Sequence, residues 1–247
     1  MPRFFLSGIE KDGRLTITGP DAHHIGFSLR MAAGERITVC DLSAAKAYTA
    51  VIDAITPDSV LAHTIEELAN SGEPPYAVTL FQGLPKSDKM DSIVQKAVEC
   101  GCARIRPFES RNCIVRLKNA DTEKKTARWQ RIAQEAAKQC GRSVCPEVLT
   151  PVGFTEMLAE LSGLDLVLFC YEGETGASIR QRLESLTKAP GKIGLVIGPE
   201  GGFDPLEVER IGEAGGESVT LGPRILRTET AAPVALAQIS YAFELAR

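Results

Sequence analysis

The chain has 247 residues, of which 44% are hydrophobic, 24% are charged and 6% are aromatic. This composition is typical of a globular protein with a sizeable core, and it excludes a disordered chain, a collagen-like repeat and a coiled coil. The net charge of −4 hides a basic middle, because residues 73–150 contain 14 Lys and Arg against 9 Asp and Glu, whereas the segments on both sides are acidic.

No apolar run approaches the length that crosses a membrane, and the first residues lack the long apolar region of a signal peptide. The seven cysteines show no paired spacing of the kind that a disulfide framework uses. We therefore expect a cytoplasmic protein with no membrane segment.

The first 72 residues alternate short β-like stretches with turns such as Asp12-Gly13 and Gly19-Pro20. The predicted strands are residues 4–9, 14–18, 36–41, 47–55 and 60–65. One helix is predicted over residues 21–31. This pattern favours a small β-barrel, and the polar run 70–75 predicts a linker after it. The first domain is thus expected to span residues 1–72.

From residue 77 the pattern changes to alternating strands and helices, in a second domain expected to span residues 73–247. Apolar strands are predicted at residues 77–84, 164–171 and 193–197, with weaker or shorter ones at 103–108 and 219–221. Strands that are apolar at every position are typical of a parallel sheet buried on both faces. We therefore expect an α/β domain with helices on both faces of a parallel sheet.

Two helices of this domain have clear signals. Ser87 is expected to cap a helix that ends at Gly101 and buries one apolar face. A second helix, residues 121–141, is expected to bury Trp129 and to present a mainly basic stripe beside it. The cations of the stripe are Arg128, Arg131, Lys138 and Arg142. The stripe predicts phosphate binding, with a plain solvated surface as the alternative.

The most informative segment is residues 195–207, in which a buried strand runs into Gly198-Pro199-Glu200-Gly201-Gly202. A helix follows, with Asp204 as its N-cap, Pro205 in its first turn and Glu207 completing a capping box. Open α/β sheets bind ligands beyond the carboxyl ends of their strands, where glycines let the backbone approach a ligand. The loop therefore predicts a binding site, unless its glycines only form a tight turn.

A second glycine loop, residues 221–233, leaves a short strand and enters a helix whose cap is predicted to be Thr228 or Thr230, with Pro233 in its first turn. The stretch 234–246 is apolar almost all round, as in a helix buried in a core or a subunit interface. Three charged residues crowd the loop, namely Arg224, Arg227 and Glu229. They predict either a chemical role or a structural Arg–Glu pair.

Several common sites are absent from the sequence. No two glycines are separated by a single residue, which excludes the G-x-G-x-x-G fingerprint of dinucleotide-binding folds. Neither a G-x-x-x-x-G-K-[ST] phosphate loop nor a G-x-S-x-G nucleophile elbow occurs. The cysteines lack C-x-x-C spacing and have no histidine nearby, so no metal site is expected. The pair His23-His24 either touches RNA or lies on a surface.

Motifs along essentially the whole chain carry a family resemblance. They are Pro2-Arg3-Phe4-Phe5, His23-His24-Ile25-Gly26, Leu29-Arg30-Met31, Gln82-Gly83-Leu84-Pro85-Lys86, Lys89-Met90, Glu99-Cys100-Gly101, Trp129-Gln130-Arg131, Gln139-Cys140-Gly141-Arg142 and, most specifically, residues 197–202 and 221–231. With these motifs the chain resembles the SPOUT superfamily of knotted RNA methyltransferases. More narrowly, it resembles the bacterial family that methylates N3 of a uridine in 16S ribosomal RNA.

The resemblance implies an N-terminal PUA-like β-barrel that helps to bind RNA, and a C-terminal α/β domain with a deep trefoil knot, which is a rare exception to ordinary chain topology. It also implies S-adenosylmethionine as cofactor, bound in a bent form between the two glycine loops. A homodimer with each site near the subunit interface is implied as well. The implied substrate is the 16S rRNA of the small ribosomal subunit.

Methylation of N3 of uracil requires that nitrogen to lose its proton. We expect Glu229 to act as the base, with Glu200 as an alternative, and Arg227 to stabilise negative charge on the uracil. The expected cofactor-binding residues are Leu168, Tyr171, Glu172, Ile197, Gly198, Pro199, Glu200, Gly201, Gly202, Leu221, Gly222, Arg224, Ile225 and Leu226. The expected RNA-binding residues are Arg3, Arg30, Lys86, Lys89, Arg111, Arg128, Arg131, Lys138 and Arg142.

Two other functions share these sequence features. The first is a non-catalytic RNA-binding or ribosome-assembly protein that keeps the fold as a scaffold. The second is a SPOUT methyltransferase that acts on another RNA nucleotide. A third candidate, a small-molecule α/β hydrolase, lacks a recognisable nucleophile.

Overall fold

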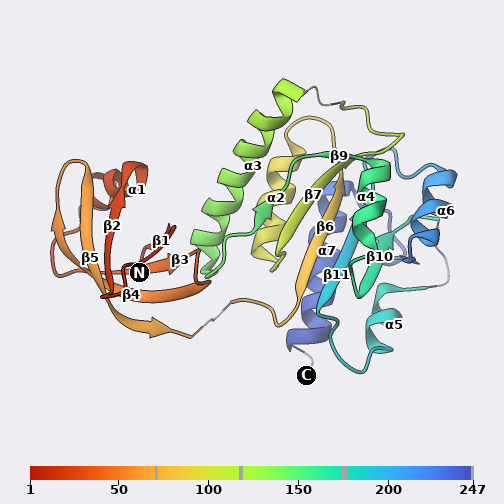
Figure 1. The fold of residues 1–247 in the computed structure, drawn as a ribbon. Helices are drawn as coiled ribbons and strands as arrows, with labels where there is room; N and C mark the ends of the chain where they lie inside the picture. The colour runs from red at the N-terminus through yellow and green to blue at the C-terminus, as the bar shows by residue number, and fades with distance from the viewer. Residues whose placement is uncertain (70–71, 117–118, 174–176, 246–247) are drawn as a thin grey trace. The chain divides into compact units, whose positions relative to one another are not determined.

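The computed structural model describes residues 1–69, 72–116, 119–173 and 177–245 (Figure 1). The chain packs as two compact units, one formed by Met1–Glu73 with Ala137–Cys145 and the other by Pro74–Ala136 with Pro146–Arg247. Within the described ranges, no helix is both long enough and apolar enough to cross a membrane. Two residues of the predicted linker, Asn70 and Ser71, lie outside these ranges.

The N-terminal unit is built on a curled five-stranded sheet with the order β1-β3-β4-β5-β2. Its strands are β1 (Arg3–Leu6), β2 (Arg14–Thr18), β3 (Arg36–Asp41), β4 (Lys46–Ile55) and β5 (Ser59–Leu68). Strand β1 runs parallel to β3, and the other neighbours are antiparallel. Alternate residues of β2 are buried, as expected of a strand with one face on the core. The five predicted strands are confirmed, with shifts at their ends.

The helix predicted over residues 21–31 is wrong in its bounds and partly in its type. A short α-helix, α1 (Gly19–His23), continues into one turn of π-helix, η1 (His24–Ser28). The wider turn passes close to β4, because a Cβ on Gly26 would lie 3.2 Å from the Ile55 side chain. Ile25 points into the core of the unit and is fully buried.

The C-terminal unit is built on a parallel sheet with the order β12-β10-β11-β6-β7-β8, and β9 also pairs with β7. The strands are β6 (Ala77–Gly83), β7 (Arg104–Glu109), β8 (Glu147–Val148), β9 (Val152–Gly153), β10 (Leu166–Cys170), β11 (Lys192–Ile197) and β12 (Gly216–Val219). Every described pairing in this sheet is parallel. This confirms the α/β class, while the trefoil knot stays a prediction, because strand order alone does not trace the threading of the chain.

Helices cover both faces of this sheet (Figure 1). They are α2 (Lys89–Glu99), α3 (Asn119–Cys140), α4 (Phe154–Leu161), α5 (Ile179–Glu184), α6 (Pro205–Glu213) and α7 (Thr228–Ser240), which continues as the π-helix η2 (Tyr241–Leu245). Met157 of α4 and Ile211 of α6 pack with Phe81, Val196 and Phe169 on one face. Helix α7 packs against β11 and α2 at the other face.

Several predicted helix starts are wrong in detail. The N-cap of α2 is Asp88 rather than Ser87, and Ser87 has a left-handed backbone (φ 53°) that precedes the helix. Helix α7 begins after Arg227, so neither predicted threonine caps it, and Pro233 lies inside the helix rather than in its first turn. The sequence patterns also missed α4, α5, β8 and β9, which are short elements of two to eight residues each.

Candidate functional site

A cavity of about 810 Å³ opens at the carboxyl edge of the parallel sheet. Strands β10, β11 and β12 end there at Cys170, Ile197 and Val219, and the loops that follow them form its walls. The three loops meet because neighbouring parallel strands end on the same edge of a sheet. Most predicted cofactor residues line this cavity, namely Tyr171, Glu172, Ile197, Gly198, Pro199, Glu200, Gly202, Leu221, Gly222, Arg224, Ile225 and Leu226.

Two predicted cofactor residues do not line the cavity. Leu168 is fully buried within β10, in the middle of the strand, and does not reach the carboxyl end at Cys170. Gly201 lies against another segment, since a Cβ on it would be 2.9 Å from the Cβ of Asn112. The predicted cofactor residues did not include several lining residues, among them Cys170, Phe203, Thr220, Thr228 and Ala231, and Lys89, which was predicted to bind RNA, also lines the cavity.

A buried hydrogen-bond chain joins the first glycine loop to α7. The Gln82 side-chain amide donates to the Thr228 hydroxyl over 2.9 Å, and that hydroxyl donates to the Gly198 carbonyl over 2.7 Å. Gly83 allows the loop to pass, because a Cβ there would lie 2.7 Å from Pro199. Thr228, predicted as a helix cap, thus connects the two cofactor loops instead.

The other side of the first glycine loop is fixed by the segment that follows β7. The Asn112 side-chain amide donates to the carbonyls of Gly201 and Gly202 over 3.1 and 3.3 Å. The buried Glu207 carboxylate accepts from the backbone N–H of Arg111 over 2.8 Å and from that of Asp204 over 3.0 Å. The predicted capping box of α6 is confirmed, and one of its members also fixes a second loop.

An ion cluster lies at the wall of the cavity beside α2. The Lys89 ammonium is 2.9 Å from Glu200 Oε1 and 3.2 Å from Glu229 Oε2. The backbone N–H of Lys86 also donates to the Glu200 carboxylate. The structure therefore places Lys89 between the two carboxylates considered as bases. Glu229 is not itself part of the cavity lining, although Lys89 and its neighbour Thr228 are.

This cluster fixes the protonation of its members. Partial burial acts to raise the pKa of Glu200, but hydrogen bonds from Lys89 and from the backbone N–H groups of Glu200 and Lys86 outweigh it, so that the pKa lies below its ordinary value of 4.5. Burial is likewise outweighed at Glu229, whose pKa its own N–H, Lys89 and the charge of Arg227 lower. The hydrogen bond to Glu200 raises the pKa of Lys89. All three groups are charged at neutral pH.

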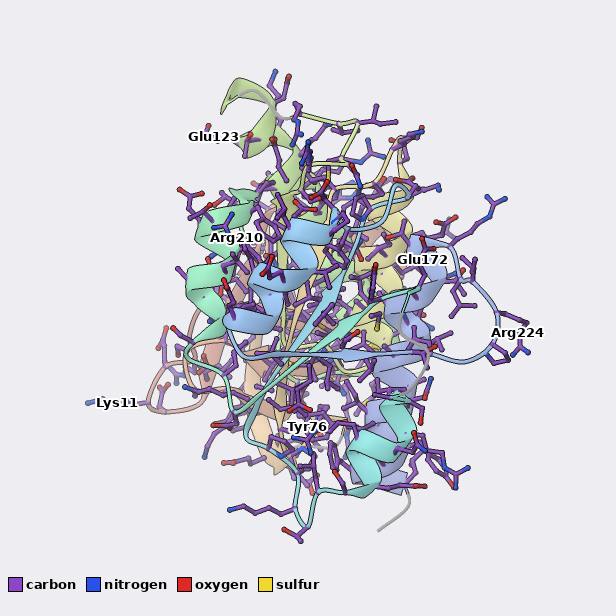
Figure 2. All side chains as sticks on the ribbon, turned by 90° about the vertical axis from the view of Figure 1, so that its right-hand side faces the viewer. Lys11, Tyr76, Glu123, Glu172, Arg210 and Arg224 are labelled. Atoms are coloured by element: carbon purple, nitrogen blue, oxygen red, sulfur yellow. The ribbon has the colours of Figure 1, made fainter. Side chains whose placement is uncertain are left out.

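The second glycine loop supplies apolar surface and cations. Ile225 is 82% exposed although it lines the cavity, so it offers an apolar contact that no described residue covers. Arg224 and Arg227 are exposed, and neither forms an ion pair within the described part of the chain. Figure 2 shows Arg224 at the outer tip of the loop, directed away from the ribbon. These two guanidinium groups are therefore available to a ligand.

The predicted RNA-binding cations fall into three groups. Arg30, Lys86 and Arg131 are exposed and have no ion pair among the described residues. Arg111 and Arg128 are largely exposed but pair with Asp204 and Asp91, respectively. The remaining four are used in internal contacts, namely Lys89 in the cavity and Arg3, Lys138 and Arg142 in the N-terminal unit.

Arg142 is the clearest case of internal use. It is 3% exposed, and its guanidinium donates to Glu73 Oε2 over 2.7 Å. Glu73 also accepts from the backbone N–H groups of Ser143 and Val144. Lys138 pairs with Asp21 over 2.8 Å. The carboxyl end of the predicted basic stripe thus stabilises the N-terminal unit and is not an open surface.

No group of three or more His, Cys, Asp or Glu side chains in the described ranges is arranged to hold a metal ion.

The three predicted catalytic residues reach the cavity in different ways. Arg227 and Glu200 line it, and Glu229 is linked to it through Lys89.

Comparison with known proteins places the chain in a family. Models of an RNA methyltransferase domain and an RNA methyltransferase PUA domain match residues 72–240 and 17–65. Ribosomal RNA small subunit methyltransferase E of Bacillus subtilis is 37% identical over 256 residues, covering 100% of this chain and 99% of the relative. The enzyme of the same name from Mesomycoplasma hyopneumoniae is 34% identical over 178 residues, covering 72% of this chain and 75% of the relative.

A solved structure gives the same result. The crystal structure of ribosomal RNA small subunit methyltransferase E from Neisseria gonorrhoeae, bound to S-adenosyl methionine, matches with a TM-score of 0.88 and 33% identity, and the match covers 98% of each chain. Fold, cavity and sequence therefore agree. The chain belongs to the ribosomal RNA small subunit methyltransferase E family.

Proposed function

We propose that this protein uses S-adenosylmethionine to methylate N3 of a uridine in the 16S rRNA of the small ribosomal subunit, in the cytoplasm. The observation that carries the proposal is the cavity at the carboxyl edge of the sheet in a chain of this methyltransferase family. The cavity combines backbone loops, an exposed apolar side chain and a charged cluster. A non-catalytic scaffold does not require such a combination.

The cavity fits S-adenosylmethionine in size and in chemistry. Its volume of about 810 Å³ lies in the range of sites for small molecules and cofactors, roughly 300–1,000 Å³. Ile225 and Leu226 offer apolar contacts to an adenine. The backbone at Gly222 is open to a ligand, because a Cβ there would meet no atom within 4 Å, whereas at Gly198 the missing side chain makes room for the Phe203 ring. The ionised Glu200 suits a cationic cofactor, and Glu172 also lines the cavity.

When bound, S-adenosylmethionine supplies an electrophilic methyl group. The contribution of the protein is then to hold the loops at a fixed distance from one another, which the Gln82–Thr228–Gly198 hydrogen bonds and Asn112 do. Positioning of reacting atoms supplies a large part of the barrier reduction in reactions of this type. These contacts lie outside the reacting centre and therefore act as positioning contacts.

Removal of the N3 proton and stabilisation of the resulting charge fall to different residues. Glu229 is ionised at neutral pH and is therefore able to accept a proton, with Glu200 as the alternative acceptor. A lowered pKa makes either carboxylate a weak base. Arg227 is exposed at the cavity and has no ion pair among the described residues, so its guanidinium is available to stabilise negative charge on the uracil oxygens.

RNA binding in this proposal uses the cations that remain exposed. They are Arg30, Lys86, Arg111, Arg128 and Arg131. We assign residues 1–72 to a PUA-like RNA-binding domain and residues 73–247 to the methyltransferase domain. The match of a PUA model to residues 17–65 and that of a methyltransferase model to residues 72–240 support this division of roles.

A homodimer completes the proposal. One side of α7 is buried, with Ala232, Ala235 and Ile239 against the core. The other side leads to Tyr241 and Leu245 in η2, which are 65% and 75% exposed. An apolar stripe of this kind on a terminal helix suits contact with a second copy. Tyr241→Glu should therefore lower the mass measured by light scattering to that of a monomer, whereas Leu206→Glu on α6 should not.

The decisive experiment maps the product. Small subunits lacking the modification are incubated with the purified protein and S-adenosylmethionine, and the rRNA is digested and analysed by mass spectrometry for 3-methyluridine. Its appearance at a single position supports the proposal. A methyl group on another nucleotide would assign the protein to a different target, and failure to bind S-adenosylmethionine in calorimetry would favour the non-catalytic alternative.

A further inference from the structure

A stacked pair of exposed rings, those of His23 and Phe27, lies in the N-terminal unit. Phe27 in η1 is 74% exposed, more than any other aromatic side chain in the described ranges. The His23 ring stacks on it, with 5.0 Å between the ring centroids and 21° between the ring planes. His23 is itself exposed, so both rings of the stack reach solvent.

The backbone holds this pair in a defined position. Leu29 N–H donates to the His24 carbonyl over 2.9 Å, and Met31 N–H donates to the Ile25 carbonyl over 3.1 Å. Ile25, two residues before Phe27, is fully buried in the core and anchors the turn from below. Single turns of π-helix inside helices occur frequently at functional sites. The backbone that carries the exposed Phe27 ring is therefore held in place by hydrogen bonds and by the buried Ile25.

Arg30, which follows this pair in the chain, has a strained backbone. Arg30 has a φ of 53°, in the left-handed region that favours glycine, yet the chain has an arginine there. The residue is exposed and has no ion pair among the described residues. Backbone strain that is kept at an exposed cation points to a use for that side chain, because glycine at this position would relieve the strain.

We propose that Phe27, supported by His23, is a stacking platform for an unpaired nucleobase of the substrate RNA, and that Arg30 contacts a neighbouring phosphate. This inference rests on the proposed function, which makes RNA the substrate. Proteins read single-stranded RNA by stacking its bases on aromatic rings, and every base has a π-face. Two rings and a cation match that chemistry, whereas a protein partner would require a broader apolar surface.

Two variants of Phe27 test the platform. Phe27→Ala removes the ring from a position so exposed that the core is unaffected, and it should weaken binding of a single-stranded oligouridylate by about 10- to 100-fold. Binding to an RNA duplex of the same length should stay unchanged, because its bases are already stacked. Leu61→Ala, which shortens another exposed apolar side chain of the same unit, is the matched control and should leave both affinities unchanged.

Phe27→Trp supplies a direct signal. The only other tryptophan, Trp129, is buried, so the new indole should be the one whose fluorescence the single-stranded oligouridylate quenches. Lack of quenching, or equal affinities of Phe27→Ala and Leu61→Ala, would overturn the proposal. Weaker binding to whole small subunits with unchanged binding to the oligouridylate would also overturn it, and would assign the surface to a ribosomal protein. The quenching does not depend on methylation, so it distinguishes failure of the platform from failure of the proposed function.

Discussion

The ion cluster around Lys89 in the C-terminal unit and the Phe27–Arg30 surface of the N-terminal unit use charge in opposite ways. In the cavity, Lys89 already pairs with two carboxylates, so the positions of these groups are set before any ligand arrives. At the surface, Arg30 is unpaired among the described residues and Phe27 is left in water. Charges with internal partners fix geometry, and charges without them are available for binding.

The basic stripe on α3 contains both cases within one helix and the turn after it. Arg131 is exposed and has no ion pair among the described residues, whereas Arg142 is buried against Glu73. A count of basic residues in the sequence treats the two alike. The difference between them can be measured in the free energy of unfolding.

Arg142→Ala tests the contribution of the buried Arg142–Glu73 ion pair to stability. Removal of the guanidinium leaves the mostly buried Glu73 carboxylate without its cation, and loss of one partner of a buried pair costs about 3–5 kcal/mol. Arg131→Ala, on the exposed part of the same helix, should change the free energy of unfolding by less than about 0.5 kcal/mol. Urea denaturation of both variants measures this difference. Equal midpoints would show that Arg142 has no special structural role.

Arg227→Ala tests the cavity. Loss of a group that stabilises developing charge typically lowers kcat by about 10²–10³-fold. The Arg227 side chain makes no capping hydrogen bond, so α7 should be unaffected. Single-turnover methylation should therefore slow, while calorimetry shows nearly unchanged binding of S-adenosylmethionine. Arg224→Ala, in the same loop but directed outward, should alter affinity more than kcat, and the opposite ranking would exchange the two roles.

Lys89→Met tests the charge cluster through pH. In the wild type the lowered pKa values keep Glu200 and Glu229 ionised above pH 4.5, and this state is lost only as the pH falls through those values. Without the ammonium, burial and mutual repulsion raise both pKa values, so the acid limb of kcat/KM should move up by about 1 pH unit.

Lys86→Met is the matched control for Lys89→Met. The backbone N–H of Lys86, and not its ammonium, contacts Glu200, so the acid limb should stay in place. If the acid limb of kcat/KM lies at the same pH in both variants, Lys89 does not lower the pKa values of these two carboxylates.

Arg30→Gly gives the smallest and most discriminating effect. Relief of the left-handed strain should raise the free energy of unfolding by about 1 kcal/mol. The same change removes a phosphate contact and should lower RNA affinity and flatten its salt dependence by about one unit of slope. Thermal denaturation and salt titration measure the two quantities. A variant that is more stable and binds RNA as well as the wild type would contradict the role of Arg30.

Local patterns predicted the elements that depend on local physics. The alternation of β2, the continuous burial of β10 and β11, and the capping box of α6 each depend on residues within a few positions of one another. Elements whose stability comes from packing were predicted poorly. The π-turn at His24–Ser28 depends on the approach of Gly26 to Ile55, which are 29 positions apart in the chain.

Sequence patterns alone predict that two glycine loops follow buried strands, and they show that a basic segment lies in the middle of an acidic chain. Which of its charges find partners becomes visible in the folded chain: Lys89 from α2 reaches carboxylates more than 100 positions away, and Arg142 reaches Glu73 across 69 positions. The physical reason is that an ion pair depends on a distance of a few ångström between side chains, and that distance is set by the packing of strands and helices far apart in the chain.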